Sequence, residues 1–251
     1  MRVGVIGTGT IGGPLIEALR RGEIAGAQLA GVLTRHGTAE SPTTLTDLLE
    51  QSDLIVEAAG QDAVAEHGPA IIVAGRDLLV VSVGALADEQ LLADVSGGPG
   101  RLYLCAGAIG GLDLLRAATA SSALTTVRLT TRKHPRSLPA GVRESAEPDT
   151  STVVFDGTAR EAASRYPENL NVAATLALAT VGMDQTFVTL ISDPHAQKTT
   201  HVVEASGDIG TYRFEISSRP SPEHPATSAV VPLAVTRAVR SLAEHPAVSF
   251  V

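Results

Sequence analysis

Three glycines near the N-terminus constrain the fold of this 251-residue chain more than any other feature. The stretch VIGTGTIGGP places Gly7, Gly9 and Gly12 in the spacing G-x-G-x-x-G, after an apolar strand and ahead of a helix. In that setting the first glycine makes the turn, the second lets a pyrophosphate approach the backbone, and the third lets helix and strand pack closely. We predict a dinucleotide-binding loop that also uses Thr10 and Ile11. The alternative is a strand-to-helix turn that binds no ligand.

The first half of the chain alternates short apolar strands with helices. RVGVIG, AQLAGVLT, DLIVEAAG, DLLVVSVGAL and RLYLCAGAIGG are typical of buried strands, and helical stretches separate them. Apolar strands that alternate with helices predict a doubly wound parallel sheet with helices on both faces. We therefore expect an α/β fold with a Rossmann domain over residues 1–107, completed by the apolar C-terminal helix within residues 225–251.

The pattern changes in residues 108–224, which we expect to form a second α/β (α+β) domain. ALTTVRLTTRKHP is a Thr-rich alternating strand, STVVFDG and QTFVTLISDP predict two more, and THVVEASGDIGTYRFEISS predicts a pair joined by a turn. AREAASRYPENLNVAATLALATVG predicts one or two helices. The segment 136–150 contains two prolines and a glycine, so we expect a loop there.

Composition excludes several classes of function. The net charge of −8 argues against a nucleic-acid partner, and 3% aromatic residues without Trp leave no stacking platform for bases. No apolar run approaches the roughly 20 residues of a spanning helix, so we expect no membrane insertion. The chain starts directly with a strand rather than a cleavable signal, and Cys105 is the only cysteine, which fits a cytoplasmic protein. The sequence predicts no metal site.

The end of the second predicted strand indicates which dinucleotide binds. An Asp or Glu about 20 residues beyond the glycines would bind the adenosine ribose hydroxyls, but the chain has VLTRHG at this place. Arg35 can form a charge-assisted contact with a 2′-phosphate, and Thr34 adds a hydroxyl donor. We therefore expect NADP to be preferred over NAD. The alternative is an Arg35 that stacks on the adenine or faces solvent.

Small residues follow the later strands of the first half. Ala59 and Gly60 end one strand, and Ala108 lies beyond another. In an open parallel sheet the carboxyl ends of the strands form the ligand crevice, so small residues there leave room for ribose and nicotinamide. We predict these three as cofactor contacts, although close packing of helices on strands explains them nearly as well.

Several segments outside the glycine loop carry a more specific signal. They are DLIVEAAG, CAGAIGGLDLL, TTRKHP, YPENLNVAATLALATVG, DP followed by TTH, and FEISSRPSPEHPATS. Together with VGVIGTGTIGGPL they make the chain resemble the L-aspartate dehydrogenase family over nearly its whole length. The resemblance implies a Rossmann domain completed by the C-terminal helix, a middle domain that carries catalysis and dimer contacts, and a homodimer.

The resemblance also implies roles for individual residues. His201, in KTTHVVEASG, matches the family's catalytic histidine, and Asn171 matches its cofactor-contacting asparagine. Ala108 matches a position on the nicotinamide side. Taken alone, His201 would more often be structural, and the alternative role for Asn171 is a helix N-cap, which asparagine often fills.

The implied reaction is reversible and uses small molecules only. L-aspartate loses a hydride from Cα to NAD(P)+, and water converts the iminosuccinate to oxaloacetate and ammonia. The two carboxylates of the substrate require cationic or amide partners, for which we predict Lys133, His134 and Lys198. Solvated loop charges explain each of these residues at least as well.

Two departures from the family pattern place the substrate in question. Ala106 stands where a serine is common, and His134 stands where a proline is more usual. We therefore keep two alternatives open: a related reductase of a semialdehyde or cyclic imine, and an NADP-binding sensor without catalytic activity.

Overall fold

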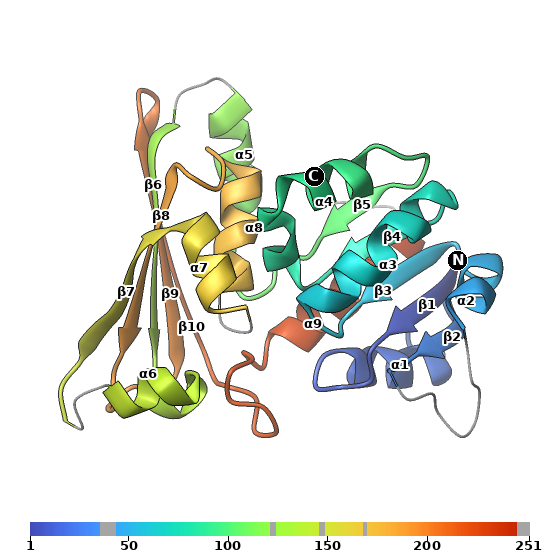
Figure 1. Cartoon of the computed structure of the whole chain (residues 1–251), viewed down its shortest axis with the longest axis horizontal. Coiled ribbons are helices and arrows are strands. Elements are labelled where there is room, and N and C mark those ends of the chain that lie inside the picture. The colour runs from blue at the N-terminus through green and yellow to red at the C-terminus, as the bar shows by residue number, and fades with distance from the viewer. Residues whose placement is uncertain (36–43, 121–123, 146–148, 168–169, 245–251) are drawn as a thin grey trace. The chain divides into compact units, whose positions relative to one another are not determined.

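The computed structural model describes residues 1–35, 44–120, 124–145, 149–167 and 170–244. The chain divides into two compact units, Met1–Cys105 with Val231–Val251 and Ala106–Val230. The sequence predicted domain boundaries at 107/108 and 224/225. Each unit contains one five-stranded sheet (Figure 1). Within the described ranges, no helix is both long enough and apolar enough to cross a membrane.

The sheet of the first unit is parallel throughout, with strand order β2-β1-β3-β4-β5. Its strands are β1 (Arg2–Ile6), β2 (Gln28–Leu33), β3 (Leu54–Glu57), β4 (Asp77–Val80) and β5 (Leu102–Leu104). Its helices are α1 (Gly12–Arg20), α2 (Leu45–Gln51), α3 (Gln61–Val73), the 3-10 helix η1 (Val83–Ala87), α4 (Glu89–Ser96) and α9 (Val231–Ala243). The prediction of a doubly wound parallel sheet is confirmed.

Helices pack on both faces of this sheet, and α9 is one of them. Leu79 of β4 belongs to the core under α1 and α9, whereas the neighbouring Leu78 faces Gly68 of α3. Figure 1 shows α3 and α9 on opposite faces. The Arg240 guanidinium of α9 donates to the Glu23 carbonyl oxygen at 2.9 Å. The prediction that the C-terminal helix completes the first domain is confirmed.

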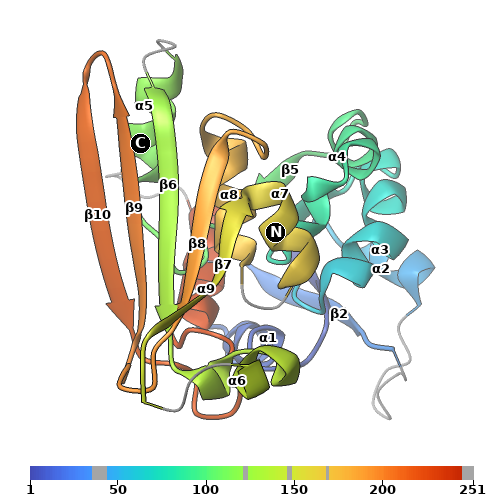
Figure 2. The same ribbon diagram turned by 60° about the vertical axis from the view of Figure 1, so that its left-hand side comes forward.

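The sheet of the second unit is mixed, with strand order β10-β9-β6-β8-β7. Only the β6–β8 pair is parallel. Figure 2 shows the five strands side by side in that order. The strands are β6 (Leu124–Lys133), β7 (Thr152–Thr158), β8 (Thr186–Ser192), β9 (Thr199–Gly207) and β10 (Gly210–Ser218). The helices are α5 (Leu112–Ala120), the 3-10 helix η2 (Pro135–Ser137), α6 (Ala140–Ser145), α7 (Ala159–Arg165) and α8 (Asn171–Ala179).

Three predicted segments differ from the structure. The strands expected in DLLVVSVGAL and RLYLCAGAIGG are shorter, because β4 ends at Val80 and is followed by η1, and β5 ends at Leu104. Apolar runs report burial, and a buried 3-10 helix meets that requirement as well as a strand does. The loop expected over 136–150 was wrong in part, since it contains the end of η2 and all of α6. Proline fits the first turn of a helix, and Pro135 and Pro139 stand at the starts of η2 and α6. Residues 146–148 of the predicted loop lie outside the described residues.

Candidate active site

The loop after β1 has the backbone geometry that a bound dinucleotide requires. Gly7 has φ +97°, and a Cβ there would lie 2.7 Å from the Ala58 carbonyl oxygen. A Cβ on Gly12 would collide with the carbonyl oxygen of Gly7. A Cβ on Gly9, in contrast, would meet no described atom within 4 Å. The first and third glycines therefore allow close packing, and the second leaves its backbone open to a ligand.

The helix that follows presents its N-terminus at this loop. Helix α1 begins at Gly12, and its first turn contains no acidic residue to compete with an anion. The N-cap residue Ile11 and the adjacent Thr10 are partly buried, and no side chain caps the helix among the described residues. Because the N-terminal N–H groups and the helix dipole attract negative charge, this end fits the pyrophosphate of a dinucleotide.

A buried polar atom without a described hydrogen-bond partner follows the end of β2. The Thr34 hydroxyl is buried and makes no hydrogen bond with any described residue, and Arg35 beside it is exposed. A buried unpaired hydroxyl costs about 1–3 kcal/mol, which a ligand oxygen would offset. The residues of the first unit therefore fit a dinucleotide at the carboxyl ends of β1 and β2.

Sequence reasoning missed Glu57, which organises the same edge of the sheet. Its carboxylate is buried and accepts from the backbone N–H groups of Ala59 (2.8 Å), Gly60 (2.8 Å) and Ser82 (2.9 Å). The Ser82 hydroxyl adds a bond at 3.0 Å, and the Val81 N–H adds a longer one at 3.3 Å. Glu57 therefore ties the turn after β3 to the turn after β4, and both turns border the cofactor crevice. The only signal in the sequence was a lone carboxylate in an apolar strand. A carboxylate that is buried in this way requires hydrogen-bond donors.

In the second unit, helices α5, α7 and α8 lie on one face of the sheet (Figures 1 and 2). Buried side chains in the middle of this sheet are apolar, as in Leu129, Leu190 and Val203. At the end formed by the last residues of β6 and β8 and the first residues of β9, the buried side chains become polar. We call this set the buried polar end; its members are Thr131, Lys133, Ser192, Thr199 and His201.

His201 lies in the buried polar end, paired in register with Thr131 of β6. Only 3% of its surface is exposed, and its Nδ1 lies 2.9 Å from the Thr131 hydroxyl oxygen. Burial, reinforced by the positive charge of Lys133, lowers the pKa of His201 to about 3. The imidazole is therefore neutral at physiological pH. In the tautomer that donates Nδ1–H to Thr131, Nε2 is a proton acceptor.

Lys133 brings a cation into the same set. It is 3% exposed, and its Nζ donates to the Ala226 carbonyl oxygen at 2.9 Å. Burial lowers the pKa of Lys133 to about 8, so a large fraction of the ammonium remains charged near neutral pH. Ser192 is the register partner of Lys133, and its buried hydroxyl has no hydrogen-bond partner among the described residues. Donors of this kind suit a carboxylate.

The other two predicted substrate residues lie outside the buried polar end. The Nδ1 of the half-buried His134 accepts from the Arg136 backbone N–H at 3.1 Å, which caps η2. Burial first, and then the charge of Arg136, lowers the pKa of His134. Lys198 is exposed in the turn before β9. The structure thus brings Lys133 to His201, and it leaves His134 and Lys198 at the surrounding surface.

The two cofactor residues predicted in the second unit come from neighbouring segments. A Cβ on Gly107 would lie 3.5 Å from Cγ1 of Val172, so the segment with the buried Ala108 lies against the start of α8. Asn171 is the first residue of α8, and the N-cap residue is Leu170. The alternative interpretation of Asn171 as an N-cap was therefore wrong.

Family models match both units. Residues 113–242 match the model for the C-terminal region of aspartate dehydrogenase. Residues 7–96 match the NAD-binding domain model of homoserine dehydrogenase. The first unit is therefore an NAD(P)-binding Rossmann domain, and the match to the second unit is the more specific one.

Whole-chain comparisons agree with the match to the second unit. L-aspartate dehydrogenase of Methanococcoides burtonii is 34% identical, covering 97% of both chains, and that of Pseudomonas aeruginosa is 38% identical, covering 98% of this chain and 97% of the relative. The crystal structure of aspartate dehydrogenase from Thermotoga maritima superposes with a TM-score of 0.75 at 28% identity, covering 100% of this chain and 99% of that one. An archaeal homoserine dehydrogenase in complex with NADPH, at 10% identity and a TM-score of 0.58, shares the fold alone. The chain belongs to the L-aspartate dehydrogenase family, as the sequence motifs predicted.

Proposed function

We propose that this protein catalyses the reversible NAD(P)-dependent oxidative deamination of L-aspartate. The product iminosuccinate reacts with water to give oxaloacetate and ammonia. The observation that carries the proposal is the buried, neutral imidazole of His201 beside Lys133, in the unit that matches the aspartate dehydrogenase model. The names of the relatives point to the same reaction.

The cofactor supplies the two-electron oxidation at Cα when it is bound. The residues that we propose to hold it in the first unit surround the crevice edge; they are Gly7, Gly9, Thr10, Ile11, Gly12, Ala59 and Gly60. In the second unit we assign the same role to Ala108 and Asn171. The glycine geometry and the N-terminus of α1 support this assignment, because backbone N–H groups bind phosphates without a cationic side chain.

We propose that NADP is preferred over NAD. The β2 segment and the two residues after it, QLAGVLTR, contain no carboxylate, and the buried Thr34 hydroxyl needs a partner. The exposed Arg35 supplies the charge for a 2′-phosphate. Arg35→Ala should weaken NADPH binding about tenfold and leave NADH binding within twofold. An unchanged ratio of the two dissociation constants contradicts the assignment.

His201 is the proposed proton acceptor. Its Nε2 takes a proton from the substrate ammonium group during oxidation, or from the water that attacks the imine carbon, and returns it in the reverse reaction. A pKa of about 3 makes His201 a weak base in the unliganded chain. The negative charge of a bound dicarboxylate raises the pKa of the imidazole, so substrate binding itself strengthens the base.

We propose that Lys133 binds a substrate carboxylate, with His134 and Lys198 as further contacts. The burial of Lys133 near His201 supports its role, because a desolvated ammonium binds a carboxylate more strongly than an exposed one. A cytoplasmic homodimer remains part of the proposal, and light scattering of the purified protein tests the dimer.

The decisive experiment follows cofactor absorbance with oxaloacetate plus ammonia, first with NADPH and then with NADH. Other oxo acids, aspartate semialdehyde and a cyclic imine serve as competing substrates. We expect turnover with oxaloacetate, loss of at least 100-fold in kcat for His201→Ala, and little change for His195→Ala, an exposed histidine of the same unit. Faster turnover of the semialdehyde or the imine would establish the reductase alternative. Tight cofactor binding without any turnover would establish the sensor.

A further inference from the structure

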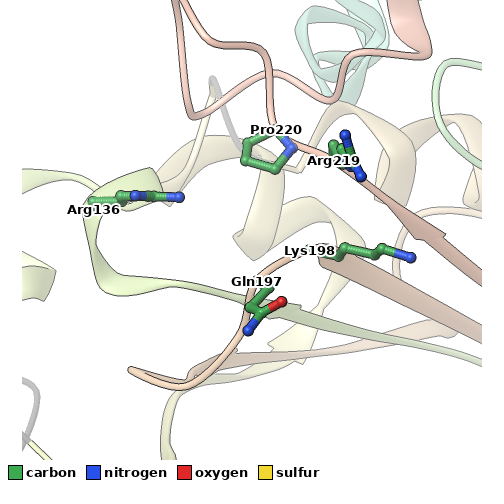
Figure 3. Close-up of a pocket in the computed structure, with 5 residues that line it drawn as sticks. All are labelled: Arg136, Gln197, Lys198, Arg219 and Pro220. Atoms are coloured by element: carbon green, nitrogen blue, oxygen red, sulfur yellow. The ribbon is translucent and has the colours of Figure 1, made fainter.

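A hollow with a cationic lining lies beside the buried polar end of the second unit. Its volume is about 360 Å³, and its lining residues are Arg136, Gln197, Lys198, Arg219 and Pro220. Figure 3 shows that they come from three separate segments. Arg136 belongs to η2, Gln197 and Lys198 precede β9, and Arg219 and Pro220 follow β10.

Among the described residues, the three cations of this hollow have no acidic partner. No described carboxylate lines the hollow, and none of Arg136, Lys198 and Arg219 makes an ion pair with a carboxylate that the structure describes. Other arginines of the same unit are paired, such as Arg132 with Asp193 at 2.9 Å and Arg160 with Asp184 at 2.7 Å. Like charges that line one hollow repel each other, and a bound anion would relieve this repulsion. The whole chain has a net charge of −8, so this cluster of three cations is a local region of opposite charge.

The chain connections tie this hollow to the buried polar end. Lys198 precedes His201 by three residues, and Arg136 follows Lys133 by three residues. Thr199 pairs with Ser218 in register, so Lys198 and Arg219 extend from neighbouring strand ends. At about 3.3 Å per residue, Lys198 and His201 are about 10 Å apart along the strand direction. An anion held in the hollow is therefore close to the buried polar end, at its exposed margin.

We propose that this hollow is a docking subsite that captures a carboxylate of the incoming dicarboxylate substrate. Guanidinium groups bind carboxylates with two parallel hydrogen bonds, and the Lys198 ammonium and Gln197 amide add donors. A volume of about 360 Å³ is sufficient for a four-carbon dicarboxylate. Because the cations are exposed, the subsite binds weakly and raises the local concentration of the anion. This inference rests on the proposed function, since it takes the substrate to be a dicarboxylate.

The test compares Arg136→Ala, Arg219→Ala and the double variant with Arg213→Ala. Arg213 is an exposed arginine of β10 that pairs with Glu204 and lies outside the hollow, so its replacement is the matched control. We expect KM for oxaloacetate to rise roughly 2- to 5-fold in each single variant and roughly 10-fold in the double variant, with a smaller effect on kcat. Added salt should raise KM of the wild type more than KM of the double variant. An unchanged KM with the wild-type salt dependence overturns the inference.

A direct measurement of dicarboxylate binding distinguishes a failure of this inference from a failure of the proposed function. Malonate is a dicarboxylate that cannot be turned over, and calorimetry measures its binding to the whole chain of each variant. If the wild type does not reduce oxaloacetate, the proposed function fails. The inference then survives only if malonate binds the wild type and the Arg213→Ala variant at least 5-fold more tightly than the double variant. Equal binding, or no binding to the wild type, overturns it.

Discussion

The hydroxyl oxygen of Thr131 and Nδ1 of His201 lie 2.9 Å apart across the β6–β9 pair, and both side chains are buried. This contact fixes the orientation of the ring, and when Nδ1–H donates to the Thr131 hydroxyl, Nε2 is left as a base. A serine-protease triad uses a carboxylate for the same task, so the partner here is a neutral counterpart. Because Thr131 carries no charge, it adds no coulombic attraction that would favour the protonated ring, as a carboxylate would.

Thr131→Val should lower kcat roughly 5- to 100-fold, because losing a buried hydrogen-bond partner costs about 1–3 kcal/mol. Cofactor affinity should stay within twofold, and Thr131→Ser should recover most of the activity. Thr130→Val, at the neighbouring position with its side chain on the other face of the strand, is the control. Wild-type kcat in Thr131→Val would show that the contact is only structural.

The pKa of Lys133 leads us to predict how kcat/KM changes at alkaline pH. Its pKa of about 8 means that its ammonium loses its proton as the pH rises through that value. We expect kcat/KM for oxaloacetate to fall above pH 8, since the neutral amine binds a carboxylate less well. Lys133→Met should lower kcat/KM at pH 7 and abolish this decline. A decline of the same shape in the variant would assign it to another group.

The pKa of His201 leads us to predict how the free energy of unfolding changes at acidic pH. Its folded-state pKa of about 3 lies below the unfolded value of 6.5, so the unfolded chain binds more protons between these two values. The free energy of unfolding is therefore greatest above pH 6.5 and falls as the pH decreases towards 3. Between pH 7 and pH 4.5 we expect this residue to cost the native state about 3 kcal/mol. In urea titrations His201→Gln should lose that much less stability over this range, and an identical loss would mean that the histidine protonates in the folded state.

The hydrogen bonds that Glu57 accepts lead us to predict that the stability of the first unit and its cofactor affinity change together. Glu57→Gln replaces one acceptor oxygen by an NH₂ group that faces the N–H donors of the two turns. We expect a loss of about 3 kcal/mol in the free energy of unfolding and a cofactor Kd raised roughly tenfold. Glu66→Gln, at a side chain of α3 that is 73% exposed, is the control. Loss of stability with unchanged cofactor affinity would show that the turns keep their positions without the carboxylate.

Local patterns were sufficient for the glycine loop, because its strand, turn and helix are adjacent in sequence. The buried polar end was harder to predict, since Lys133 and His201 are 68 positions apart in the sequence and the β6–β9 pairing brings them together. Glu57 was missed for a similar reason: its donors lie in two turns after different strands. Periodicity reports which residues are buried, whereas the partners of a buried polar group depend on topology.

The glycine loop allows ligand binding to be separated from folding by two substitutions three residues apart. Gly9 has space for a methyl group, so Gly9→Ala should keep the wild-type Tm within about 1 °C. That methyl group would stand where the pyrophosphate approaches the backbone, so cofactor Kd should rise at least tenfold. Gly12→Ala would instead push its Cβ against the Gly7 carbonyl oxygen and cost about 3 kcal/mol of stability. Thermal melting and cofactor titration of both variants check this, and normal cofactor affinity in Gly9→Ala would place the pyrophosphate elsewhere.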